Sequence, residues 1–223
     1  LSVSVTENGG VEERSGAVNL HVDGDFLIEI PVKQSGLYMD MTESRFDFES
    51  GAASRTVSMS TNLSFWNVLE KPSWVSVSPE SGEAGEHTLT INVEDNPNTT
   101  KREGRVVVGN QGLSLADTLW VTQEGKSFGP LETVLQFENV ASSNTLDIST
   151  DGDWTVTTSD GWITVAPSSG HGNGQVTVTV EANETDNERT GLLSVAVGGT
   201  VQYVNVVQKG RYFTIDRGSS ASL

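Results

Sequence analysis

The chain has 223 residues, no cysteine and a formal net charge of −17 at pH 7. Its 13 Lys and Arg residues, set against 30 Asp and Glu residues, exclude a nucleic-acid partner, because phosphate binding needs clustered cations. The lack of cysteine excludes disulfides and thiolate metal sites, and no apolar run approaches the roughly 18 to 20 residues that a membrane-spanning helix needs.

Residues 1–36 contain alternating apolar and polar patterns that predict three short strands. The strands are expected at residues 3–5, 17–22 and 26–33. Asp23-Gly24 separates the last two and is a typical hairpin turn, whereas Pro31 lacks a backbone donor and indicates a sheet edge. Three strands are about half of a small sandwich, so we expect residues 1–36 to be the C-terminal half of a repeat.

Residues 43–125 and 131–210 each predict about seven strands, with turn signals between them and no helical period. In the first stretch the strands are expected at residues 46–48, 57–59, 66–68, 75–77, 89–93, 105–108 and 115–122. In the second they are expected at residues 135–137, 146–148, 154–156, 163–165, 174–183, 191–197 and 201–207, with a hairpin turn at Gly198-Gly199. The fold class is therefore all-β, a tandem array of antiparallel β-sandwich domains.

One motif occurs twice in the chain. In each copy two tryptophans lie eight residues apart, Trp66 and Trp74 in one copy and Trp154 and Trp162 in the other. Trp154 follows Trp66 by 154 − 66 = 88 residues. This step is the size of one small sandwich domain and is too long for a solenoid repeat.

Each copy ends in an Arg-x-Gly followed by a Gln-x-Gly, and residues 1–36 contain this ending alone. The arginines and glutamines are Arg14, Arg102, Arg189, Gln34, Gln123 and Gln208. We expect a boundary after each Gln-x-Gly, which gives domains at 37–125 and 126–210, with short linkers at 37–42 and 126–132. Residues 211–223 form a tail or the start of a further copy, so the native array is expected to continue.

The tryptophans are expected to differ in burial. Trp66 and Trp154 share the parity of the apolar residues in their strands and are expected in the core. Trp74 and Trp162 have the opposite parity, so they either face outward or close the sandwich at a strand start. Because sugar faces stack on flat exposed rings, Trp74 and Trp162 are the candidate carbohydrate-binding residues. Trp120 is expected to pack within its strand.

The recurring arginine and glutamine allow a functional and a structural interpretation. The arginine could bind a ligand, or it could pair with local carboxylates or carbonyls at a strand start. We favour the structural role because the residue recurs in every copy, and we expect the glutamine to bond backbone groups. The loops at residues 94–96 and 181–183 offer oxygen ligands for Ca²⁺, but neither matches an EF-hand.

No pattern in the chain predicts catalysis. His21, His87 and His171 do not recur between copies and have no metal-ligand spacing. The chain contains no Gly-x-Ser-x-Gly, no His-Glu-x-x-His and no phosphate-binding loop, and no carboxylate pair stands out as a glycosidase dyad. We therefore expect no catalytic, cofactor-binding or metal-binding residues and no cofactor.

Taken together, the motifs resemble the BACON domain of Bacteroidetes. They are Trp-x7-Trp-[Ile/Val]-x-Val-x-Pro-x-Ser-Gly, a valine-rich strand ending in Glu-x-Asn, Arg-x-Gly and Val-x-Gln-x-Gly. The resemblance covers residues 43–125 and 131–210, and residues 1–36 in part, and is weaker at residues 95–97. It implies an immunoglobulin-like β-sandwich in exported, surface-attached proteins, often beside glycoside hydrolase modules. It also implies either the binding of carbohydrate or mucin glycans or a spacer role.

We therefore expect a non-catalytic exported array at the cell surface or in the periplasm, with its signal segment outside this chain. The array would act as a spacer or as a weak glycan- or mucin-binding module. The alternative is an accessory region of a glycan-processing enzyme, or an unrecognised hydrolase, which would need a cleft with converging carboxylates or a metal. Residues 1–36 alone would expose Val3, Val5, Val18 and Leu20 to water. We therefore expect one of three outcomes: they pack against the next domain, they pair with another chain, or they belong to a domain whose first half lies outside this sequence.

Overall fold

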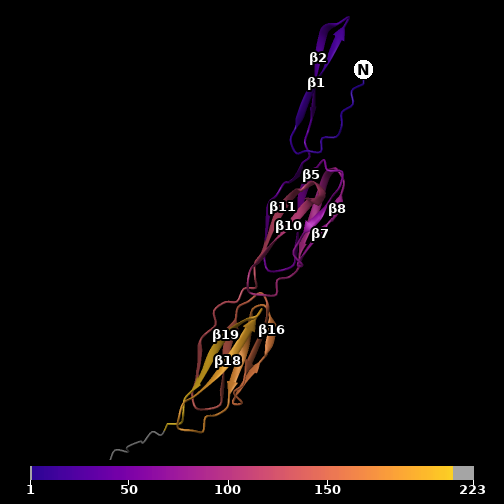
Figure 1. Ribbon diagram of the computed structural model, residues 1–223. Helices are drawn as coiled ribbons and strands as arrows, with labels where there is room; N and C mark the ends of the chain where they lie inside the picture. The colour runs from indigo at the N-terminus through magenta and orange to yellow at the C-terminus, as the bar shows by residue number, and fades with distance from the viewer. Residues whose placement is uncertain (1, 213–223) are drawn as a thin grey trace, which may run out of the picture. The chain divides into compact units, whose positions relative to one another are not determined.

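The computed structural model describes residues 2–212 and consists almost entirely of β-strands (Figure 1). The chain divides into two compact units, one holding residues up to Asp95 together with Arg102–Gln123, and the other holding the remainder. The predicted start of a further copy at 211–223 lies outside the described residues from residue 213 onward. Among residues 2–212, no helix has the length and apolar character needed to cross a membrane.

The first unit begins with a hairpin, drawn in indigo in Figure 1, of β1 (Arg14–Val22) and β2 (Asp25–Gln34). Asp23 and Gly24 form its turn with φ angles of 52° and 91°. The Asp-Gly signal is thereby confirmed, because a two-residue turn of this kind requires positive φ at both positions. Arg14 stands directly opposite Gln34 at the open end of the hairpin.

Residues 3–5, which the sequence predicted as a strand, form none. Their counterparts in the next copy lie in β9 (Gly85–Val93), which is paired on both sides, with β5 (Ala53–Thr61) and β7 (Val75–Ser78). Residues 1–36 contain no counterpart of either partner strand. An alternating apolar pattern forms a strand only where a neighbouring strand accepts its backbone hydrogen bonds, so this prediction was wrong for a physical reason.

The first unit continues with a sandwich of two sheets. One sheet has the order β4-β11-β10-β6-β8 and the other has the order β3-β5-β9-β7. The remaining elements are β3 (Met39–Met41), β4 (Arg45–Phe48), β6 (Trp66–Glu70), β8 (Ser81–Gly82), β10 (Arg102–Asn110), the 3-10 turn η1 (Gln111–Leu113) and β11 (Leu115–Gln123). The turn η1 connects β10 to β11.

The second unit contains a sandwich of the same plan, drawn in orange to yellow in Figure 1. Its sheets have the orders β12-β19-β18-β14-β16 and β13-β17-β15. The strands are β12 (Val134–Phe137), β13 (Ser142–Ile148), β14 (Asp153–Thr158), β15 (Ile163–Ala166), β16 (Ser169–His171), β17 (Gly174–Val180), β18 (Arg189–Val197) and β19 (Thr200–Gln208). Gly198 and Gly199 make the predicted hairpin turn with φ angles of 49° and 81°.

These sheets confirm the predicted all-β sandwich class, with one parallel pair at the edge of each sandwich. The strand β4 pairs in parallel with β11, and β12 pairs in parallel with β19. The predicted linkers are not plain connections, because β3 pairs with β5 and Phe128 bridges Thr150. Apolar side chains in both segments pack against the cores. This packing holds the segments close enough to the sheets to pair with their strands.

The first tryptophan of each copy lies in the centre of its core. Trp66 is 0% exposed and Trp154 is 3% exposed, which confirms the prediction from strand parity. The indole N–H of Trp154 donates to the carbonyl of Gly172 at 3.0 Å, as a buried indole requires. A Cβ atom on Gly170 would stand 2.4 Å from the Trp154 ring. The glycine of the Ser-Gly motif is therefore needed for the ring to pack.

The two cores lie within the predicted domains. One extends from Met41 to Val121 and the other from Leu135 to Val206. Each combines the buried face of every long strand, as the alternation of buried and exposed residues in β17 illustrates. The domain boundaries after residues 36, 125 and 210 stay predictions.

Candidate functional site

The arginine and glutamine that end each copy form one recurring cluster, which we call the clasp. Its pairs are Arg14 with Gln34, Arg102 with Gln123 and Arg189 with Gln208. Each pair joins the first residue of one strand to the last residue of its antiparallel neighbour. The topology of the closing hairpin therefore sets the contact, and the same sequence motif gives the same geometry three times.

The arginine of the clasp bonds to a glutamine and to the backbone of the preceding loop. The Nε atom of Arg189 donates to Oε1 of Gln208 at 2.9 Å. Its Nη2 atom donates to the carbonyl of Glu181 at 2.7 Å and to that of Ala182 at 3.2 Å. Because these donors are used within the domain, the clasp confirms the structural interpretation of the recurring arginine.

The glutamine of the clasp is buried and bonds backbone on both sides of the sandwich, as predicted. Gln208 is 0% exposed, and its Nε2 atom donates to three carbonyls. The acceptors and distances are Glu138 at 3.0 Å, Val140 at 3.3 Å and Glu181 at 2.9 Å. One side chain thus ties the loop after β12 to the end of β17 and to the last strand.

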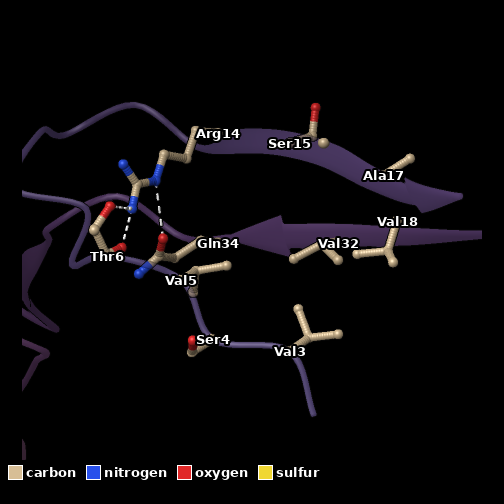
Figure 2. A pocket seen from close by; sticks show the side chains of 11 residues that line it. Val3, Ser4, Val5, Thr6, Arg14, Ser15, Ala17, Val18, Val32 and Gln34 are labelled. Atoms are coloured by element: carbon tan, nitrogen blue, oxygen red, sulfur yellow. Dashed lines mark hydrogen bonds between the residues drawn. The ribbon is translucent and has the colours of Figure 1, made fainter. Parts of the chain in front are cut away.

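The copy at residues 37–125 repeats this geometry, whereas in residues 1–36 only the arginine contacts recur, around a half-buried Gln34. Arg102 bonds Gln123 at 2.9 Å and the carbonyls of Glu94 and Asp95 at 2.7 and 3.2 Å. Partial burial lowers the pKa of the Arg102 guanidinium from its ordinary value. In the first copy Arg14 bonds Gln34 at 2.8 Å and the carbonyl of Thr6 (Figure 2).

The predicted sugar-binding tryptophans, Trp74 and Trp162, lie beside the clasps. Both are half-buried and pack against the edge of their core, at the start of β7 and β15. The guanidinium carbon of Arg102 lies 4.4 Å from the Trp74 ring centroid, and that of Arg189 lies 4.2 Å from the Trp162 centroid. One face of each ring is therefore already taken by a cation–π contact, and their assignment as sugar platforms stays a prediction.

The same contacts bear on the Ca²⁺ alternative for the loops at residues 94–96 and 181–183. The backbone carbonyls of Glu94 and Glu181, which a cation would use, instead accept hydrogen bonds from Arg102 and Arg189. A guanidinium at that position repels a metal ion. Among residues 2–212, no group of three or more His, Asp or Glu side chains is placed to hold a metal.

A pocket of about 380 Å³ opens on residues 1–36. Figure 2 shows Val3, Val5, Val18 and Val32 around it, with the clasp of Arg14 closing one end. Their counterparts in the next copy, at the same distances from the clasp, are buried core residues, namely Ile91, Val93, Val106 and Val121. The pocket is thus the uncovered interior of half a sandwich, and Val3 and Val5 remain 47% and 57% exposed.

Sequence reasoning misplaced Trp120, which was expected to pack within its strand. Its side chain is 46% exposed on the outer face of β11. The signal was present in the parity of β11, because the alternate residues Leu119 and Val121 are both fully buried.

Two family models match the chain. The viral BACON domain model matches residues 130–211. The BACON model, which is described as "Putative binding domain, N-terminal", matches residues 64–124. Both matched segments contain a complete Trp pair, the Ser-Gly motif and a complete clasp.

One curated relative is the xyloglucan-specific endo-β-1,4-glucanase BoGH5A of Bacteroides ovatus. It is 32% identical over 78 residues, which are 35% of this chain and 16% of the glucanase. This chain therefore matches only a small part of that enzyme's length.

Two solved structures are also similar to the chain. The Bacteroides ovatus GH5 xyloglucanase in complex with a XXXG heptasaccharide is 27% identical, with a TM-score of 0.36, over 44% of this chain and 23% of that chain. The I9–I11 tandem from titin is 11% identical, with a TM-score of 0.40, over 88% of this chain and 74% of that chain.

Proposed function

Since this chain belongs to the BACON domain family, we propose that it is a non-catalytic β-sandwich array that acts as a spacer and contacts glycans weakly. The observation that carries this proposal is that the residues recurring between copies serve packing and hydrogen bonding within each domain. The first tryptophan of each pair fills a core, and the arginine and glutamine are used in the clasp. The residues that recur between copies are therefore the residues that stabilise the fold. This is expected of an array whose function depends on its stable, repeated structure.

Glycan contact is the second part of the proposal. The matched relative is a xyloglucan-specific glucanase, and the second matched family model describes a binding domain. Trp74 and Trp162 remain candidates, because each ring is only half-buried. With one face covered by arginine, each ring has little surface left for a sugar, so any affinity at these two positions is weak.

The expected location and partners remain proposals as well. We place the array at the cell surface or in the periplasm, where glycans, including mucin, are within reach. Its net charge of −17 keeps it soluble and repels anionic polymers.

Residues 1–36 are proposed to contact another chain through their apolar face rather than through the edge of β2. In the later copies the counterparts of Pro31 are Trp120 and Asn205, whose N–H groups each donate at 2.9 Å to begin the parallel pairing with β4 or β12. Proline has no N–H to donate, so a parallel strand added at this edge would lose its first hydrogen bond. The face lined by Val18 and Val32 has no such barrier.

An accessory region of a glycan-processing enzyme is the second candidate function. The match to a glucanase over 16% of its length favours it, because such a segment can stand beside a catalytic domain. In this case too the array itself carries out no chemistry.

Two measurements on the full chain test the proposal. We expect no release of reducing ends from a panel of polysaccharides, and glycan-array binding with dissociation constants on the order of millimolar. Heparin serves as the anionic control and mucin as the complex-glycan arm. Measurable hydrolysis, or binding with a submicromolar constant, would contradict the proposed function.

A further inference from the structure

Trp120 stands in the middle of a row of polar side chains on the outer face of the β4-β11-β10-β6 sheet. Its register partners are Arg105 on β10 and Arg45 on β4. Side chains directly opposite each other on neighbouring strands lie about 5 Å apart, so the ring has an arginine on each side. The row continues on β6 with Glu70, which bonds to Arg105, and it spans four strands, roughly 14 Å.

Both arginines are held in place by partners within the sheet. Arg105 donates from Nε and Nη2 to the two carboxylate oxygens of Glu70, at 2.9 and 2.8 Å. Arg45 donates to Asp47 at 2.9 Å and to the hydroxyl of Thr122 at 2.6 Å. Such pairing fixes the position of each guanidinium while leaving further N–H groups unused, since a guanidinium has five.

The hydrogen bonds that Arg105 donates also lower the pKa of Glu70 below its ordinary value. Glu70 therefore stays ionised and able to accept hydrogen bonds in neutral and mildly acidic solution. Together the two ion pairs give the row donors and acceptors without a net charge.

This row is specific to one domain. At the matching positions of β18, β19 and β12, the third copy has Leu192, Asn205 and Val134, and Thr158 stands in place of Glu70. None of these is aromatic or charged. The fold does not require the row, because an equally regular sandwich forms without it.

We propose that the face centred on Trp120 is a binding platform for a neutral polysaccharide of β-linked pyranose rings. The inference rests on the glycan contact of the proposed function and names its site. A pyranose with equatorial hydroxyls presents axial C–H groups on its flat face, and these pack against the electron-rich face of an indole. The hydroxyls at the edge of the sugar ring would then accept hydrogen bonds from Arg45 on one side of Trp120 and from Arg105 on the other.

The charge of the platform selects the class of glycan. Its two arginines are matched by Asp47 and Glu70, and the chain as a whole carries −17. The negative charge of the chain would repel an anionic polysaccharide, and both arginines of the platform are already paired with carboxylates. A neutral polysaccharide meets no such repulsion. The four-strand width suits several sugar rings in a line, so a polymer should bind better than a monosaccharide.

The test is affinity electrophoresis of the full chain in gels that contain hydroxyethylcellulose, with polygalacturonate gels as the anionic arm. We expect retardation by the neutral polymer alone, and Trp120→Ala should weaken it about tenfold or more. Trp120→Phe, which keeps a flat ring, should retain part of the affinity. Tyr203→Ala is the matched control, because Tyr203 is 59% exposed on β19 opposite Ser194, without flanking arginines.

Each result decides the inference. Equal retardation of the wild type and Trp120→Ala, or a preference for polygalacturonate, overturns it. Loss of binding in Trp162→Phe with Trp120→Ala unaffected moves the site to the half-buried tryptophans and overturns it too. A wild type that binds no neutral polymer overturns the platform but leaves the spacer function standing, which the hydrolysis assay tests separately. Unchanged denaturant midpoints for Trp120→Ala and Trp120→Phe show that any loss of binding is not due to unfolding.

Discussion

The guanidinium of Arg189 lies over the indole of Trp162, with its carbon 4.2 Å from the ring centroid. The same guanidinium bonds Gln208 and the carbonyl of Glu181. Ring, cation and amide are therefore one structural unit at the end of the sandwich. The guanidinium covers one face of the Trp162 ring, which a sugar would otherwise stack on. Trp120, in contrast, remains 46% exposed.

Replacement of Trp154 by Ala is expected to destabilise its domain by about 3–5 kcal/mol, because a large buried ring leaves a cavity. Hydrogen exchange on the full chain measures this loss domain by domain. A loss below about 1 kcal/mol would place the ring outside the energetic core. The amides of residues 37–95 act as an internal control.

Gly170→Ala should destabilise the same domain by about 1–3 kcal/mol, because the added methyl overpacks the site. The new Cβ would stand 2.4 Å from the Trp154 ring. Gly161→Ala is the matched control, since a Cβ there meets nothing within 4 Å. Chemical denaturation of both variants decides the point, and equal midpoints for the two would show that the Ser-Gly motif serves another purpose.

The pKa values of Glu70 and Glu138 should lie below the ordinary value of 4.5, because Glu70 accepts hydrogen bonds from Arg105 and Glu138 accepts them from Lys209 and Tyr212. A carboxyl group whose pKa is lower in the folded state adds stability above its unfolded pKa. That stability is lost as the pH falls through the lower, folded pKa. Carbon-13 NMR of the side-chain carboxyls measures both values. In Arg105→Met, Glu70 should return toward 4.5 while Glu138 does not move.

The open face of residues 1–36 should make the chain associate as its concentration rises, because exposed apolar surface favours contact. Val32→Asp places a charge on that face and should shift sedimentation velocity profiles toward the monomer. Asn19→Asp adds the same charge to the opposite side of the hairpin, since Asn19 and Val18 are adjacent in β1 and point to opposite faces. Equal behaviour of the two variants would argue against contact through the apolar face.

The sequence was sufficient to predict features that depend on local geometry. The burial of Trp154 followed from strand parity, and the turn at Asp23-Gly24 followed from the need for positive φ. The structural use of Arg189 followed from its recurrence, although its partners could not be named. These features need little more than the chain within one strand or one hairpin.

Features that depend on distant partners could not be predicted in the same way. The strand expected at residues 3–5 fails because its neighbours would have to come from elsewhere. Trp162 stands just before its strand begins, where parity no longer fixes direction, so its stacking with Arg189 was hidden. The platform around Trp120 depends on the parallel pairing of β4 with β11, a contact between segments far apart in the chain.

The most direct test of the claim that the recurring residues serve the fold is hydrogen exchange of the full chain with Arg189→Met. Methionine keeps much of the aliphatic bulk but removes the hydrogen bonds to Gln208, Glu181 and Ala182. We predict that the opening free energy of core amides between residues 126 and 212 falls by about 1.5–3 kcal/mol, the usual value for a charged hydrogen bond. Core amides that exchange as slowly as in the wild type would show that the clasp does not support the fold, and would contradict the account.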